Sequence, residues 1–285
     1  MFKLNATGLL MAVMLGLAPA AMAENVTLLD VQGFESYTSG ASINGQNGWT
    51  GNAITYDGTS GTDRWAGVYK DSQGVQLPNM PGIAIGCKNT EARHTIDAAG
   101  TATSTYQVNY SMYLHNYGAG TTCWDFQLEQ FENSTRYFPV TVRVTNVIDS
   151  NYFRVQAIES DVSGTIISTL YDSYVDDNTR FANNQQIRLD IQTIVDLATN
   201  TYDLKITMWT PATWNSGVPV LVLEADNLAI TGPDTTPISV IRYVGRAAGT
   251  PWTMCDNVVV QVVPEPATMA LLALGGLGCL LRRRK

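Results

Sequence analysis

The chain has 285 residues, of which 17 are Lys or Arg and 25 are Asp or Glu, and its formal net charge is −8 at pH 7. Five of the cations but only one of the acids lie in the two end segments, so residues 24–263 carry a net charge of about −12. A surface this acidic repels phosphate backbones, and no basic stripe alternates with aromatic residues. Nucleic acid is therefore excluded as the expected partner, whereas neutral glycans and divalent cations stay open.

The first 23 residues are typical of a secretory signal peptide. One cation, Lys3, precedes the apolar residues 9–17, and Ala21 and Ala23 form a small-x-small cleavage pattern. We predict cleavage after Ala23 and an exported protein that begins near Glu24.

Residues 24–263 are predicted to form one large β domain, because they show few helical patterns and many runs of alternating polarity. In the clearest run, residues 105–115, an apolar face that includes Tyr106, Val108 and Tyr110 alternates with a polar face. We expect the first face in the core and the second in water. Further strands are predicted at 26–31, 124–129, 138–145, 152–158, 165–170, 186–195, 201–209, 218–223, 238–244 and 258–263.

Residues 186–195 and 201–209 are predicted to form a β-hairpin. Asp196 and Asn200 bound the intervening loop, and such residues stabilise turns through bonds between side chain and backbone. This passage, with IRLDI followed by VDLATNTYDLKI, resembles the central hairpin of concanavalin A-like lectin/glucanase jelly rolls, including laminin-G-like domains. The resemblance implies an all-β fold, an antiparallel β-sandwich of the jelly-roll type, with another β-sandwich as the alternative.

The last residues have three parts: the rigid Pro264, Glu265 and Pro266, an apolar run at 267–281, and a basic terminus at 282–285. Fifteen helical residues reach about 22 Å, short of the roughly 30 Å hydrocarbon core, although Arg snorkelling brings the segment closer to spanning. The four terminal cations would hold this end on the cytoplasmic side. A plain tail anchor or a buried core helix is the alternative.

Val263 with the Pro-Glu-Pro, the short apolar helix and the Arg cluster resemble the PEP-CTERM sorting signal. In that family the tag directs an exported bacterial protein to an exosortase, which processes it before release to the cell surface or exopolysaccharide. The resemblance implies a processing site at Pro264, Glu265 and Pro266, and a precursor held in the inner membrane by the C-terminal helix. The stretches GFESY at 33–37, INGQNGW at 43–49 and CDNVVV at 255–260 also resemble the opening and the closing strand of β domains in PEP-CTERM proteins.

Catalytic patterns are weak. The β-glucan hydrolases of the concanavalin A-like superfamily carry Glu-x-Asp-x-Glu or Glu-x-Asp-x-x-Glu on a strand, and neither DFQLE at 125–129 nor ESDVSG at 159–164 fits. Asp125, Gln127 and Glu129 share one strand face and contain a candidate carboxylate pair, but we interpret this face as solvated. No nucleophile elbow or phosphate loop is present in the sequence. We expect a non-catalytic protein, with a glycoside hydrolase or polysaccharide lyase as the alternative.

Carbohydrate binding fits better, since sugars are recognised by aromatic platforms and by planar amides and carboxylates. Trp65 and Trp214 are the preferred platforms, because Asp63 and Asn215 stand near them in the sequence. For each loop tryptophan the alternative is a plug at the edge of the sandwich. Tryptophans in such contexts are Trp49, Trp65, Trp214 and Trp252.

A structural calcium is a second candidate ligand. Glu35 near the first strand and Asp256 near the last are its candidate ligands, with solvated turn acids as the alternative. Cys87, Cys123 and Cys255 lie in an exported body where disulfides are permitted, and three alternative single bridges stay open.

The sequence therefore predicts a signal peptide at 1–23, a concanavalin A-like domain at 24–263 and a sorting signal at 264–285. Its predicted role is non-catalytic, at the cell surface or in the extracellular matrix, through binding of polysaccharide. The alternatives are the polysaccharide-degrading enzyme and a purely structural matrix protein.

Overall fold

The structure is a computed structural model. It describes residues 25–31, 43–51, 54–57, 83–86, 91–96, 104–115, 122–132, 135–146, 152–160, 166–176, 186–210, 213, 216–230, 236–245 and 253–263. The chain divides into a unit spanning Val26–Val262 and a second unit made of the two terminal segments, Met1–Asn25 and Val263–Lys285. Of the second unit, the described residues are Asn25 and Val263.

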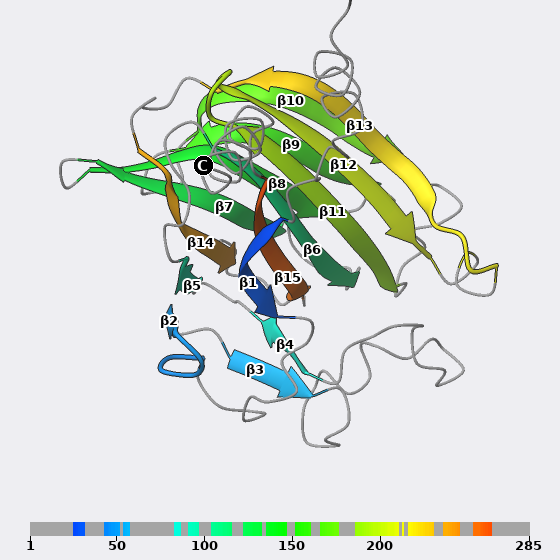
Figure 1. Ribbon diagram of the computed structural model, residues 1–285. Coiled ribbons are helices and arrows are strands. Elements are labelled where there is room, and N and C mark those ends of the chain that lie inside the picture. The colour runs from blue at the N-terminus through cyan, green and yellow to red at the C-terminus, as the bar shows by residue number, and fades with distance from the viewer. Residues whose placement is uncertain are drawn as a thin grey trace, which may run out of the picture. The chain divides into compact units, whose positions relative to one another are not determined.

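Strands of the Val26–Val262 unit form two sheets, and the strand pairs described are antiparallel (Figure 1). Sheet A runs in the order β13 (Val220–Ala229), β12 (Thr201–Trp209), β11 (Gln186–Asp196), β6 (Thr105–His115), β15 (Thr253–Val263), β4 (Ile83–Gly86) and β3 (Ile54–Asp57), and β1 (Val26–Val31) also pairs with β15. Sheet B runs in the order β10 (Ile166–Asp176), β9 (Tyr152–Ser160), β8 (Thr135–Asn146), β7 (Thr122–Glu132), β14 (Ile238–Gly245), β5 (Glu91–Thr95) and β2 (Trp49–Gly51).

The two sheets pack through their apolar faces. Tyr106, Val108 and Tyr110 of β6 are buried on the inner face of sheet A, and Phe126 is buried on the inner face of sheet B. The rings of Tyr110 and Phe126 stack with their centroids 3.7 Å apart, so one core joins the sheets. Burial of large apolar side chains, each contributing about 1.5–3 kcal/mol, is what holds this sandwich together.

The predicted hairpin is confirmed as β11 and β12. Its loop is fixed locally, because the Asp196 carboxylate accepts hydrogen bonds from the backbone N–H groups of Ala198 and Thr199 at 2.9 and 3.3 Å. Asn200 has a φ of 54°, a left-handed conformation that Asn adopts more readily than most residues. The turn thereby sets the register in which Asp196 faces Thr201.

The structure also departs from the predicted elements. The short strands β2, β3, β4 and β5 were missed, because three to five residues are too few to establish a period of two and β2 and β3 lie in a region rich in Gly and Asn. Strand β13 runs past the predicted 218–223, to Ala229, and β10 runs past 165–170, to Asp176.

Within the described ranges, no helix is long and apolar enough to cross a membrane. Residues 1–23 and 264–285, where a signal peptide and an apolar helix are predicted, lie outside those ranges.

Candidate functional site

The face of β7 that we predicted to be solvated is buried, so that prediction was wrong. Asp125 and Gln127 are 0% exposed and Glu129 is 1% exposed. Buried charges are found in proteins where partners compensate for lost hydration. Arginine side chains from neighbouring strands supply that compensation.

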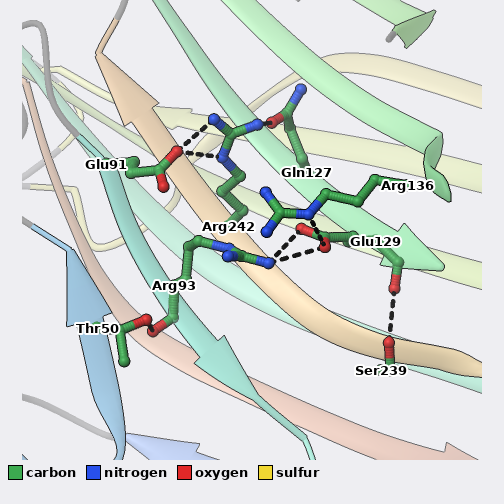
Figure 2. Close-up of polar contacts among 8 residues, drawn as sticks. All are labelled: Thr50, Glu91, Arg93, Gln127, Glu129, Arg136, Ser239 and Arg242. Carbon is green, nitrogen blue, oxygen red and sulfur yellow. Dashed lines mark hydrogen bonds and ion pairs between the residues drawn. The ribbon is translucent and has the colours of Figure 1, made fainter. Parts of the chain in front are cut away.

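Asp125 and Glu129 each bind guanidinium groups. Nε and Nη2 of Arg143 donate to the two Asp125 oxygens at 2.7 and 2.9 Å. Nη2 of Arg93 donates to both Glu129 oxygens at 2.8 and 3.0 Å, and Arg136 Nε lies 3.4 Å from Glu129 Oε1. Figure 2 shows Arg93 and Arg136 approaching Glu129 together. The oxygens that a carboxylate catalyst would present to a substrate are here engaged by cations of the fold itself.

Gln127 joins this network between the two acids. It accepts a hydrogen bond from Arg242 Nη1 at 3.1 Å and donates to Ser160 Oγ at 3.0 Å. Arg242 also pairs with Glu91, as Figure 2 shows. Arg242 lies opposite Gln127 on β7 and opposite Arg93 on β5. We assign the outer face of sheet B a structural role, in which a row of ion pairs ties β5, β14, β7 and β8 together.

The outer face of sheet A carries a second polar surface, and this one contains a pocket of about 310 Å³. We call it the sheet A pocket. Its polar lining comes from four strands, β12, β11, β6 and β15, which are consecutive neighbours in the sheet (Figure 1). The lining residues that matter here are Asn109, Arg188, Asp190, Gln192, Lys205 and Thr207.

Alternation along the strands and register between them bring these residues together. On β11, Ile187, Leu189 and Ile191 point into the core, so the residues between them point outward. Asp190 then lies opposite Ser111 of β6 and Thr207 of β12. Gln192 lies opposite Asn109 and Lys205 in the next outward row, which makes a rigid platform of three strands.

Asp190 is the centre of the hydrogen bonding at this surface. Its Oδ1 accepts from Ser111 Oγ at 2.8 Å and from Arg188 Nε at 2.6 Å, and its Oδ2 accepts from the indole Nε1 of Trp209 at 2.7 Å. The Asn257 amide donates to Ser111 Oγ at 3.3 Å, which extends the network to β15. These contacts fix the Asp190 carboxylate, yet its side chain remains 31% exposed to the pocket's side of the sheet.

Arg188 is held as a cation beside this carboxylate. Burial lowers the pKa of its guanidinium, but Tyr113, Asp190 and Asp256 together raise that pKa by more, so it ends above its ordinary value. The guanidinium lies 5.9 Å from the Tyr113 ring centroid. Burial is also the main cause that raises the pKa of Tyr113, so its phenol keeps its proton near pH 7.

Gln192 and Lys205 form the open part of the pocket. Gln192 Nε2 donates to Asn109 Oδ1 at 3.1 Å, which aligns two amides across β11 and β6. Lys205 is 46% exposed, and its ammonium lies 2.9 Å from the carboxylate of Glu224, which is 48% exposed. The arrangement can bind a polar ligand, because the amides, the guanidinium and the ammonium can donate hydrogen bonds to it and the carboxylate can accept them from it.

The residues predicted from sequence meet different outcomes. Asp256 lies in β15 and is fully buried, whereas Glu35 lies outside the described residues, so the calcium pair stays a prediction. Trp49 is 1% exposed and packs edge-on against His94 with ring centroids 5.1 Å apart, so it is an edge plug.

In the part of the chain that the structure describes, no group of three or more His, Cys, Asp or Glu side chains could hold a metal ion. Predicted residues outside that part are Ala23, Asp63, Trp65, Trp214, Asn215, Pro264, Glu265 and Pro266.

The cysteine alternatives also stay open. Cys123 lies in β7 of sheet B, Cys255 is buried in β15 of sheet A, and Cys87 lies outside the described ranges.

The sheet A pocket was not predicted from the sequence. The signal was present in the outward residues of one hairpin, where Arg188, Asp190 and Gln192 face Lys205 and Thr207. A solvated hairpin face has the same pattern, and the partner strand β6 lies about 80 residues earlier in the chain. The pocket becomes visible only once that register is known.

Comparison with solved structures supports the jelly-roll fold. The chain is similar to the CBM2 module of the evolved Dit protein of Lactobacillus casei BL23 phage J-1, with a TM-score of 0.52 and 10% identity over 85% of this chain and 98% of that chain. It is more distantly similar to the lectin from Bauhinia forficata in complex with GalNAc, with a TM-score of 0.42 and 9% identity over 84% of this chain and 98% of the lectin chain. At 10% identity the likeness to the CBM2 module shows the fold alone. A comparison with curated protein sequences finds no relative.

The fold of the body and the motif in the tail both agree with the predictions made from the sequence. The body folds as an all-β antiparallel sandwich of the jelly-roll type. Residues 262–285 match the PEP-CTERM protein-sorting motif, which confirms the resemblance of the tail. The chain is therefore an exported protein with a jelly-roll body that carries a C-terminal PEP-CTERM sorting signal.

Proposed function

We propose that this protein acts without catalysis at the cell surface or in the extracellular matrix and binds polysaccharide through the sheet A pocket. An exosortase-type enzyme would process the precursor near Pro264, Glu265 and Pro266, after the C-terminal helix has held it in the inner membrane. The sorting motif at 262–285 supports the export and processing steps. The jelly-roll likeness concerns the fold alone, so the binding step is argued from the pocket.

The observation that carries the binding proposal is the fixed polar platform around Asp190. Sugars present vicinal hydroxyls, which pair well with planar groups that both donate and accept hydrogen bonds. Gln192 and Asn109 supply such amides, and Asp190 adds a carboxylate that accepts, all on strands rather than on loops. Ligand sites built on strands hold their geometry closely. The pocket volume of about 310 Å³ lies at the lower end of the range found for small-ligand sites.

The non-catalytic part of the proposal draws support from β7. Asp125 and Glu129, the carboxylates nearest to a hydrolase pattern, are buried and bound by Arg143 and by Arg93 with Arg136. A retaining hydrolase needs two carboxyl groups that face the substrate. Release of reducing ends or of unsaturated sugars from any glycan would replace this proposal with the enzymatic alternative.

Affinity electrophoresis tests the proposal. The full-length chain is run in gels cast with a panel of polysaccharides, including the exopolysaccharide of the producing cell, with calcium and with a chelator. We expect retardation on at least one glycan, weakened by Gln192→Ala, which removes an amide of the pocket. Gln261→Ala is the matched control, because Gln261 is a half-buried residue of β15 that bonds Thr27 in the same sheet, away from the pocket lining.

Three outcomes are informative. Loss of retardation in Gln192→Ala with retention in Gln261→Ala supports binding in the pocket. Equal retardation of both variants places any binding elsewhere. Unchanged mobility of the wild-type chain on every glycan contradicts the binding proposal and favours a purely structural matrix protein.

A further inference from the structure

The charges of the sheet A pocket differ from those of the protein as a whole. Residues 24–263 carry a net charge of about −12. The charged groups that line the pocket are Arg188, Asp190 and Lys205, two cations and one anion. Glu224, the ion-pair partner of Lys205, brings the charges in and around the pocket into balance, so an anion meets less repulsion here than over the rest of this acidic protein.

The two cations of the pocket are held very differently. Arg188 is 14% exposed, and its Nε donates to Asp190 at 2.6 Å, so this pair belongs to the framework of the pocket. Lys205 is 46% exposed and stands at the rim, toward β13. Its ammonium is thus the cation best placed to meet a ligand that enters from solvent.

Glu224 occupies the position that an anionic ligand would take. Lys205 Nζ lies 2.9 Å from Glu224 Oε1, and the two residues face each other across β12 and β13. Both side chains are about half exposed, and exposed pairs of this kind contribute little to stability because water and salt screen them. A carboxylate delivered by a ligand can therefore replace Glu224 on Lys205 at small cost.

Two amides of the pocket lining can bind the hydroxyls of a sugar whose carboxylate is held by Lys205. Gln192 lies directly opposite Lys205 on β11, and Asn109 lies opposite Gln192 on β6. Adjacent strands are about 4.8 Å apart, so the ammonium and the two amides span roughly 10 Å across the sheet. One anionic sugar bound to Lys205 would thus place its hydroxyls, or those of its neighbour in the glycan, over the amides.

We infer that the sheet A pocket selects acidic glycans, and that Lys205 is the residue that determines this selectivity by binding a sugar carboxylate in place of Glu224. This inference rests on the proposed function, since it names the class of polysaccharide that the pocket takes. The amides of the pocket can bind the hydroxyls of acidic and neutral glycans alike, whereas the Lys205 ammonium forms an ion pair only with acidic glycans.

Titration calorimetry of the full-length chain tests the inference with two probes that share one sugar backbone, of which one carries charged carboxylates and the other neutral methyl esters. The first is an oligogalacturonate, and the second is the same oligomer with its carboxylates methyl-esterified. We expect the wild-type chain to bind the free acid several-fold more tightly than the ester at low salt, and the difference to shrink as salt is raised.

Three substitutions assign the effect. Lys205→Gln should lower affinity for the acid by roughly threefold to tenfold and leave the ester within about twofold, because only the ion pair is lost. Glu224→Gln should raise affinity for the acid, since it removes the competing carboxylate. Asp226→Asn is the matched control: it removes one negative charge from the exposed part of β13, two residues beyond Glu224, and should change affinity far less than Glu224→Gln does.

The outcomes separate this inference from the proposed function. If the acid and the ester bind wild type equally, or if Lys205→Gln weakens both alike, the selectivity is wrong while polysaccharide binding stands. If Asp226→Asn raises affinity as much as Glu224→Gln, the effect is one of general charge, and the role given to Lys205 is wrong. If neither probe binds, nor any glycan of the electrophoresis panel, both proposals fail.

Discussion

The pair formed by Asp125 and Arg143 gives the sharpest test of the packing described for sheet B. The Asp125 carboxylate is fully buried and accepts two guanidinium hydrogen bonds, at 2.7 and 2.9 Å. Arg143→Met keeps much of the apolar length of the side chain but leaves this carboxylate without that guanidinium. Breaking a buried pair from one side costs about 3–5 kcal/mol, because a buried charge loses its compensation.

Substitution of the other partner, Asp125, should lower the free energy of unfolding by less. Asp125→Asn keeps an oxygen that accepts one hydrogen bond, and the Arg143 side chain, 11% exposed, retains access to water. We expect a loss of about 2–3 kcal/mol for this variant. Thermal unfolding followed by circular dichroism measures the stability of both variants. For a domain of this size, the loss of about 3–5 kcal/mol expected for Arg143→Met corresponds to a fall in Tm of about 6–20 °C.

An exposed ion pair provides the control for this comparison. Lys205→Met removes one partner of a pair in which both side chains are about half exposed, so its cost should be below about 1 kcal/mol. A loss of less than 1 kcal/mol for Arg143→Met, or a loss equal to that of Lys205→Met, would refute the claim that the sheet B network is buried and structural.

The remaining predictions concern the backbone and the pocket. Gly51→Ala should destabilise the chain strongly, because the new Cβ would lie 2.1 Å from the Glu91 carbonyl oxygen at a φ of 116°. Gly45→Ala, at a φ of 83° with open space around the new Cβ, should lower Tm less, since it adds strain without a clash. At the hairpin, Asn200→Ala should cost about 1 kcal/mol in urea unfolding and Asn200→Gly much less, because the φ of 54° suits Gly; equal losses would contradict the assigned turn. Lys205→Gln should leave the urea midpoint unchanged while it lowers affinity for acidic glycans, and a large shift of the midpoint would contradict its exposed position.

Strand identity and hairpin register could be predicted where one face is continuously apolar. Strand β6 spans Thr105–His115 as expected, and β11 and β12 form the expected hairpin, because Ile187, Leu189 and Ile191 leave no ambiguity about which face is buried. Local turn chemistry at Asp196 then fixes the connection. Such features depend on residues close together in the sequence.

The state of the opposite face could not be predicted in the same way. Alternation shows that Asp125, Gln127 and Glu129 share a face, but not what covers it. Arg143 lies 18 residues from Asp125 in the chain, and Arg93 lies 36 residues from Glu129. Arg242 lies 115 residues from Gln127. On β6, Tyr113 falls on the alternate face of residues 105–115 that we expected in water, but it is buried beside the Arg188 guanidinium.

The pocket depends on the same missing information. Asp190 is surrounded by Arg188 two residues away, Trp209 across the hairpin and Ser111 at 79 residues distance. A single sequence suggests the first two contacts but not the third. For this reason the sequence favoured loop tryptophans such as Trp65 as sugar platforms, whereas the described structure offers a site on strands.

The central claim is that glycans bind at the outer face of sheet A, and the most direct measurement is an NMR titration of the full-length chain with ¹⁵N-labelled tryptophan. The indole N–H of Trp209 donates to Asp190 at 2.7 Å, so a ligand in the pocket should change its chemical shift. Trp49 and Trp124 are buried away from the pocket and serve as internal references. We predict that a retarding glycan shifts the Trp209 signal in a saturable manner while those of Trp49 and Trp124 stay in place. Binding that leaves the Trp209 signal unchanged would contradict the account.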